Sequence, residues 1–237
     1  MKKRIISMLL CLALMCALAV TAFAEDGETV ISNINEESAL IYNTELIAIY
    51  EATLYADGKT AQDVYCVLCK GLDFSEFDPT EPRSYASCVL IALSNEHNAY
   101  TNELIGAIKN NVPAGSKLVL MGHSLGGMVI QQVIAQKEIK DNYQVLNTVA
   151  IGSPYILTCG SKEGFLRRIV DRLDPVPYMS IPLLANSYMG NAANETSFLS
   201  PLVHFRSYKD AKCWRVYDCL GTKNGSAYIV LNELIYS

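Results

Sequence analysis

The stretch Leu118–Ile130 constrains the fold most, because an apolar run leads through Gly-His-Ser-Leu-Gly into a second apolar run. The first run, Lys117–Met121, predicts a buried strand, and the second, Leu125–Gln136, predicts a helix that is apolar nearly all round. Glycines two positions before and after Ser124 allow the sharp strand-to-helix turn that projects a serine hydroxyl above a sheet edge. The glycines also let a helix pack close to a sheet, so the rest of the chain must decide between chemistry and packing.

Strand and helix patterns alternate through the middle of the chain. The predicted strands are Val64–Cys69, Lys117–Met121, Val145–Ile151 and Phe165–Val170, and the predicted helices are Ala39–Ala56, Ser94–Asn111 and Leu125–Gln136. Near the end of the chain, Trp214–Tyr217 and Ala227–Leu231 flank Asn224-Gly225, which is typical of a hairpin turn. The alternation indicates one α/β domain over residues 25–237, with a mostly parallel central sheet and helices on both faces.

The first 24 residues have the pattern of a secretory signal peptide. A basic start, Met1–Arg4, precedes the uncharged apolar run Ile5–Val20, and Ala22-Phe23-Ala24 stands before the acidic pair Glu25-Asp26. The alternative is a membrane anchor, but a run of about 16 residues is shorter than the roughly 20 that a bilayer requires. We therefore expect cleavage after Ala24 and a secreted protein, of bacterial type.

The charge balance argues against nucleic acid as a partner. The chain carries 19 basic and 24 acidic residues, and removal of residues 1–24 leaves 16 basic residues and a net charge of −8. No lysine- or arginine-rich block occurs in the sequence. Nucleic acids and anionic membrane surfaces are therefore poor candidates for partners.

The cysteines predict neither a disulfide scaffold nor a metal centre. Cys66 and Cys69 resemble a Cys-x-x-Cys redox or metal pair, yet they lie within an apolar strand-like run. In an extended chain their Cα atoms are about 10 Å apart and the side chains point to opposite faces, so we expect buried thiols. With three histidines and no second Cys-x-x-Cys, a structural zinc site has little support, and we expect no cofactor.

A serine hydroxyl is a poor nucleophile at neutral pH, so Ser124 requires a base. His97 precedes the serine in a predicted helix, where a surface or packing role is expected. His123 is adjacent to Ser124, and its side chain is expected to point away from the hydroxyl and shape the turn. Elimination leaves His204 as the candidate base, and the alternative is a core histidine beneath the tyrosine-rich end of the chain.

Two aspartates follow the predicted strand that ends at Val170, and either can be the acid that orients the base. Asp174 heads Asp-Pro-Val-Pro, a rigid loop that would fix a carboxylate at the carboxyl edge of the sheet. Asp171 has three arginines nearby and can instead form a surface ion pair. We therefore expect Asp174 to be the acid.

Four motifs, in order, resemble the lipase class 3 family over about residues 63–206. The first is the nucleophile motif at Ser124, and the others are a strand ending in Gly-Ser-Pro, an aspartate before a Val-Pro turn, and a late histidine. They lie at residues 119–127, 149–154, 168–177 and His204. The resemblance implies an α/β-hydrolase fold and the catalytic order Ser124, Asp174, His204.

The oxyanion hole departs from the family pattern. The Leu125 N–H at the start of the predicted helix is expected to bind the developing oxyanion. The family's usual Arg-Gly-Thr or Arg-Gly-Ser is replaced by Lys70-Gly71-Leu72, so a hydroxyl residue is missing at the second position. The resemblance assigns the backbone N–H of Leu72 as the second donor.

These patterns predict a secreted hydrolase of carboxylic esters, acting on lipid or acylglycerol substrates and able to contact a lipid–water interface. The alternatives are a thioesterase, an acyltransferase or a peptidase on the same fold, or a non-catalytic binding protein that retains it. Two apolar segments, Phe74–Leu93 and Tyr178–Val203, can either line an acyl-chain site or close the core.

Overall fold

The computed structural model describes residues 39–71, 98–157, 159–180, 185–189, 201–209 and 217–232. The expected signal peptide, His97, Leu72 and the segment Phe74–Leu93 lie outside these residues. The strands are β1 (Leu40–Asn43), β2 (Ile47–Tyr55), β3 (Ala61–Cys69), β4 (Lys117–His123), β5 (Gln144–Ile151), β6 (Phe165–Asp171), β7 (Ser187–Met189) and β8 (Tyr228–Leu231). The helices are α3 (Ala99–Asn111), α4 (Leu125–Val133), α5 (Lys137–Asn142) and α6 (Pro201–Arg206), with 3-10 turns η4 (Val176–Met179) and η6 (Ser207–Lys209).

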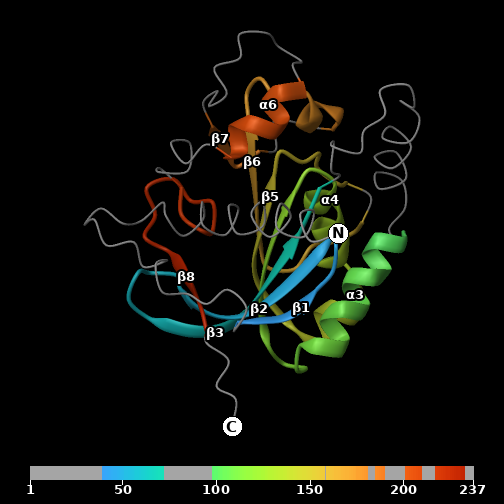
Figure 1. Ribbon diagram of the computed structural model, residues 1–237, viewed down its shortest axis with the longest axis vertical. Helices are drawn as coiled ribbons and strands as arrows, with labels where there is room; N and C mark the ends of the chain where they lie inside the picture. The colour runs from blue at the N-terminus through green and yellow to red at the C-terminus, as the bar shows by residue number, and fades with distance from the viewer. Residues whose placement is uncertain are drawn as a thin grey trace, which may run out of the picture.

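The strands form one mostly parallel sheet in the order β1-β2-β3-β4-β5-β6-β7 (Figure 1). Strands β3 to β7 pair in parallel, so their carboxyl ends meet at one edge of the sheet. Strands β1 and β8 both pair antiparallel with β2, β1 along Ala48–Tyr50 and β8 along Ala52–Tyr55. The predicted α/β fold with a mostly parallel sheet is confirmed.

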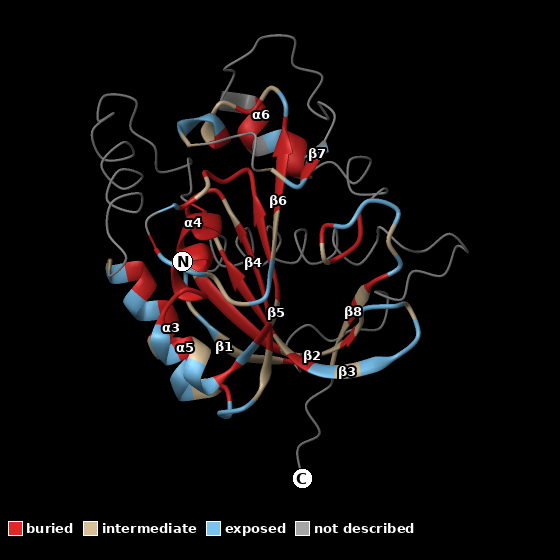
Figure 2. Cartoon of the chain, turned by 180° about the vertical axis from the view of Figure 1, so that it is seen from behind, coloured by how far each residue is buried: buried red, intermediate tan, exposed pale blue. Residues whose placement is uncertain are grey.

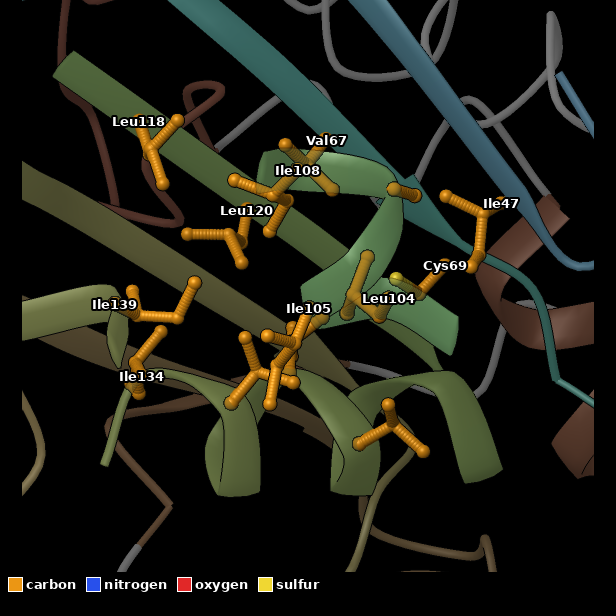
Figure 3. Packing of buried hydrophobic residues seen from close by; sticks show 14 of the residues in the cluster. Ile47, Val67, Cys69, Leu104, Ile105, Ile108, Leu118, Leu120, Ile134 and Ile139 are labelled. Atoms are coloured by element: carbon orange, nitrogen blue, oxygen red, sulfur yellow. The ribbon is translucent and has the colours of Figure 1, made fainter. Parts of the chain in front are cut away.

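One face of the sheet is covered by α3, α4 and α5, and this layer holds the larger hydrophobic core. Leu104 and Ile108 of α3 pack with Val67 of β3 and Leu120 of β4, while Ile139 joins them from α5 (Figure 3). Figure 2 shows that α4 and the central strands are buried almost throughout. This burial explains why the α4 sequence is apolar apart from its two glutamines.

The second face is covered, within the described residues, by η6 and the C-terminal segment. Tyr208 of η6 and Tyr217, Cys219 and Ile229 pack against the strand side chains of this face. Cys66 lies in this second core, whereas Cys69 lies in the core beneath α3 and α4. The prediction of buried thiols on opposite faces is therefore confirmed, and burial raises the pKa of the Cys66 thiol to about 12.

The predicted helix over Ala39–Ala56 is wrong, because the segment forms β1 and β2. Isoleucine, tyrosine and threonine recur along this apolar run, and a strand that pairs on both edges can bury them. The hydroxyl of Thr44 accepts hydrogen bonds from the Leu46 and Ile47 N–H groups and turns the chain between the two strands. The predicted helix stop at Asp57-Gly58 is instead the turn between β2 and β3, with Gly58 at φ 73°.

The predicted C-terminal hairpin is only partly described, and the pairing that the described residues show for β8 is with β2. Asn224 does adopt the positive φ of a turn residue, 56°. Tyr217 forms an isolated antiparallel bridge with Lys223, and Trp214–Val216 lies outside the described residues. Residue Asn224 therefore adopts the predicted turn conformation, and β2, the described partner of β8, lies far away in the sequence.

Two helix boundaries differ from the sequence prediction. Helix α3 begins after Asn98, whose side chain accepts a hydrogen bond from the Thr101 N–H at 2.8 Å, and the predicted cap Ser94 lies outside the described residues. Helix α4 ends at Val133, and the short helix α5 follows it unpredicted. None of the helices that the structure describes combines the length and apolarity needed to cross a bilayer.

Candidate active site

Ser124 lies at a sharp turn between β4 and α4, at the carboxyl edge of the parallel strands. Its backbone angles are φ 56° and ψ −120°, a region that non-glycine residues rarely adopt and that costs roughly 1–3 kcal/mol. The Ser124 N–H donates to the Ile151 carbonyl at 2.9 Å, which fixes the turn against the end of β5. The Ser124 side chain makes no capping hydrogen bond to α4, so its hydroxyl is not used to stabilise the helix.

The two glycines that flank Ser124 are required by close backbone contacts. A Cβ atom on Gly126 would lie 2.2 Å from the Cys69 carbonyl oxygen at the end of β3. A Cβ atom on Gly122 would lie 2.5 Å from the carbonyl carbon of Gly126. The glycines therefore form the turn and also seat α4 against the sheet, as the sequence predicts.

Gly126→Ala is expected to destabilise the fold, because the atom in conflict belongs to the backbone of β3 and cannot rotate away. Overpacking of this kind costs about 1–3 kcal/mol, and we expect a lower melting temperature together with lower activity. Gly106→Ala is the matched control, since its Cβ meets nothing within 4 Å in the middle of α3, and it should stabilise by up to about 1 kcal/mol. Equal melting temperatures for Gly126→Ala and the wild type would contradict this account.

Asp174 occupies the loop after β6, where three hydrogen bonds hold its carboxylate. Oδ1 accepts from the Val176 N–H at 2.9 Å, and Oδ2 accepts from His204 Nδ1 at 2.8 Å and from the Tyr208 hydroxyl at 2.7 Å. The side chain is completely buried. The predicted surface ion pair for Asp171 is wrong, because Asp171 is also completely buried and accepts from the Leu173 N–H at 2.9 Å.

His204 lies on α6, beyond the carboxyl ends of the parallel strands (Figure 1). A carboxylate accepts the hydrogen bond from Nδ1, so this nitrogen carries the proton and Nε2 is left as the basic nitrogen. Ser124, Asp174 and His204 are all buried, with Ser124 only 2% exposed. The structure thus joins Asp174 to His204 directly.

The His123 ring contacts His204, which the sequence did not predict. The two rings stack with centroids 4.7 Å apart, and His123 Nε2 lies 3.2 Å from the His204 carbonyl oxygen. Because a carbonyl only accepts, His123 donates from Nε2. His123 therefore does more than shape the turn: it attaches the end of β4 to the helix that carries His204.

Tyr208 is a second site residue that the sequence reasoning missed. It follows His204 by four residues, and its hydroxyl reaches the same carboxylate oxygen as His204 Nδ1. A spacing of four residues in a helical segment places two side chains on one face. That spacing was the available signal for Tyr208.

The structure describes one of the two expected oxyanion donors, Leu125. Leu125 is the first residue of α4, where backbone N–H groups have no acceptor within the helix. Leu72 lies outside the described residues, but its neighbour Gly71 packs directly on the turn, since a Cβ there would lie 2.8 Å from the Ser124 Cβ. The chain after β3 therefore passes beside Ser124.

The parts of the chain that the structure describes contain no candidate metal centre. No group of three or more histidine, cysteine, aspartate or glutamate side chains occurs there with a geometry that would hold a metal ion. Asp174, His204 and Tyr208 form one hydrogen-bonded group, and the N-terminus of α4 begins directly after Ser124.

Comparison with known proteins gives a family match over part of the chain. Residues 89–198 match the model of the PGAP1-like alpha/beta domain, a span that contains Ser124 and Asp174 and ends before His204. No curated protein sequence matches the chain.

Several solved lipases resemble the structure at low sequence identity. A deletion mutant of the Rhizomucor miehei lipase propeptide complex has 15% identity, covers 90% of this chain and 80% of its own, and has a TM-score of 0.39. A triacylglycerol lipase from Penicillium expansum has 16% identity, coverage of 88% and 97%, and a TM-score of 0.38. The Lip2 lipase from Yarrowia lipolytica has 14% identity, coverage of 76% and 77%, and a TM-score of 0.32.

The strand order and the position of the strand-to-helix turn define the class of fold. The chain is an α/β protein of the α/β-hydrolase type, with the turn at the carboxyl end of β4. In chain order the serine precedes the aspartate and the histidine comes last, which is the order of triads on this fold.

Proposed function

We propose that the protein is a serine hydrolase of carboxylic esters, a lipase or esterase, that forms an acyl-enzyme on Ser124. The observation that carries the proposal is the buried hydrogen bond of 2.8 Å between Asp174 Oδ2 and His204 Nδ1, at the sheet edge where the turn presents Ser124. A buried carboxylate that sets the tautomer of a histidine is the arrangement that makes imidazole a general base.

The proposed reaction has two half-reactions. The Ser124 hydroxyl oxygen attacks the ester carbonyl carbon while its proton passes to His204 Nε2, and the carbonyl oxygen becomes an oxyanion that faces the Leu125 N–H. The protonated His204 then gives that proton to the departing alcohol, which leaves the acyl group on Ser124. Water attacks the acyl-enzyme with His204 again acting as the base, and the carboxylic acid product leaves.

Lipid or acylglycerol esters are the proposed substrate class. The sequence resemblance to class 3 lipases supports this class, and so does the exposure of apolar side chains on loops beside the site. Leu157 and Met179 are 59% and 45% exposed. Their two segments adjoin, because the Tyr155 N–H, two residues before Leu157, donates to the hydroxyl of Ser180, the residue after Met179. Such side chains suit contact with a lipid–water interface.

Secretion remains part of the proposal and rests on the sequence pattern of residues 1–24. A secreted ester hydrolase meets its substrates outside the cell. Expression of the full chain in a bacterial host should release a product that begins at Glu25, as N-terminal sequencing can check.

A fluorophosphonate probe and a series of p-nitrophenyl esters test the proposed activity. We expect the probe to label the folded protein at Ser124, located by peptide mass spectrometry, and we expect hydrolysis of the esters and of triglyceride emulsions. A preference for long acyl chains would favour a lipase, and a preference for short chains an esterase. A folded protein that is neither labelled at Ser124 nor active on any ester would refute the proposal.

A further inference from the structure

The Tyr208 hydroxyl connects three parts of the site. It donates to Asp174 Oδ2 at 2.7 Å, and it accepts a hydrogen bond from the Asp171 N–H at 2.9 Å. Tyr208 itself follows α6, which carries His204, and its side chain is buried. One hydroxyl thus ties the end of β6 and the Asp174 loop to the segment that carries His204.

The direction of the Tyr208 hydrogen bond is fixed by its surroundings. The Asp171 N–H can only donate, so it takes a lone pair of the phenol oxygen, and the phenol proton is directed to the Asp174 carboxylate. Burial, and next the charge of Asp174, raises the pKa of Tyr208 well above its ordinary value. Tyr208 therefore stays a donor throughout the pH range in which esterases are assayed.

Two donors share one carboxylate oxygen. His204 Nδ1 and the Tyr208 hydroxyl both bind Asp174 Oδ2, at 2.8 and 2.7 Å, while Oδ1 is used by the Val176 N–H. Hydrogen bonds to a carboxylate are charge-assisted, and each donor draws on the same negative charge. The Tyr208 hydroxyl consequently orients Oδ2 and also limits how strongly that oxygen stabilises a protonated His204.

We propose that Tyr208 is a positioning residue of the hydrolase, which holds Asp174 Oδ2 in line with His204 and tunes the proton affinity of that histidine. The inference rests on the proposed function, because it assigns Tyr208 a part in the same reaction. Without the hydroxyl, Oδ2 is less well oriented and its full charge is available to His204. The base would then remain protonated, and so inactive, to a higher pH.

Other titratable and charged groups also face this cluster. Asp171 and Arg168 approach Tyr208 from β6. His123 contacts both the His204 and Tyr208 rings from β4, with centroid distances of 4.7 and 5.5 Å. Replacement of the Tyr208 hydroxyl alone leaves these groups in place, so a changed pH profile would report on the shared oxygen.

The test compares Tyr208→Phe with Tyr143→Phe. The control removes another buried hydroxyl, which donates to the Val112 carbonyl at 3.2 Å beneath the sheet and away from the site. The measurement is kcat and kcat/KM for a p-nitrophenyl ester from pH 5 to 9, per active site titrated with the fluorophosphonate. For Tyr208→Phe we expect about a tenfold lower kcat and an acid limb moved up by about one pH unit. Tyr143→Phe should keep the wild-type profile.

Several results would overturn the inference. One such result is an acid limb for Tyr208→Phe that stays in place or moves to lower pH. Another is a lower number of titratable sites with an unchanged kcat per site, because that pattern indicates a purely structural role.

If Tyr208→Phe does not fold, 3-fluorotyrosine at position 208 replaces it. This phenol is a stronger donor of nearly the same shape, and it should move the acid limb to lower pH; no shift would again overturn the inference. Wild-type labelling and hydrolysis, measured in the same series, report separately on the proposed function.

Discussion

Ser124→Ala is expected to lose ester hydrolysis almost completely, by about 10⁶-fold in kcat. Without the hydroxyl, no acyl-enzyme can form, and only direct attack of water remains. The fold should survive, because the Ser124 side chain makes no capping hydrogen bond. Serine and alanine both carry a Cβ atom, so the unusual backbone angles at this position cost about the same for either residue. Steady-state rates on the best ester, with the melting temperature measured on the same sample, check both expectations.

Ser187→Ala is the matched control for the serine variant. Ser187 is a buried serine on β7, three strands along the sheet order from β4, and its hydroxyl donates to the Gly221 carbonyl at 2.8 Å. This variant should lose some stability and keep its activity and its labelling. If purified Ser124→Ala hydrolysed esters at more than a few per cent of the wild-type rate, Ser124 would not be the nucleophile.

Asp174→Asn is expected to lower kcat by about 10⁴-fold. Three donors converge on the carboxylate, from Val176, His204 and Tyr208, and an asparagine has a single acceptor atom. An amide N–H that faces His204 would force Nδ1 to accept, so the proton would move to Nε2 and the basic nitrogen would be lost. Rates measured across the pH range, on protein with a native circular dichroism spectrum, test this expectation.

Asp171→Asn separates the role of Asp174 from that of its neighbour. Asp171 is equally buried, but its carboxylate accepts from the Leu173 N–H while His204 bonds to Asp174. We expect a destabilised enzyme whose kcat falls far less than that of Asp174→Asn. If the two asparagine variants were equally inactive, the assignment of the acid to Asp174 would lose its support.

The sequence predicts the centre of the fold well because the relevant signals are local. The turn at Ser124 needs glycines at fixed positions beside it, and the end of β6 is marked by the Asp-Pro-Val-Pro loop that carries Asp174. Both features depend on residues within one strand and one turn. The preference for Asp174 over Asp171 likewise followed from the rigidity of that loop, and the structure bonds Asp174 to His204.

The failures arise where distant pairing decides the structure. Residues 40–55 carry an apolar pattern that suits either a helix or a buried strand, and pairing with β3 and β8 selects the strand. The partner of β8 cannot be read from its own turn, because that partner is β2. The ring contact between His123 and His204 depends on how α6 approaches the sheet, which no local pattern encodes.

The pairing of β8 with β2 has a consequence for how the chain folds. The Thr53 and Asn232 side chains are hydrogen-bonded at 2.8 Å although they are 179 positions apart in the sequence. Loop closure over such a separation is entropically costly, and chains dominated by distant contacts fold slowly. The edge of β2 also stays without its β8 partner until residues 228–231 have been synthesised. Folding of the sheet should therefore finish only after this segment is available, and the nascent chain should expose an unpaired strand edge until then.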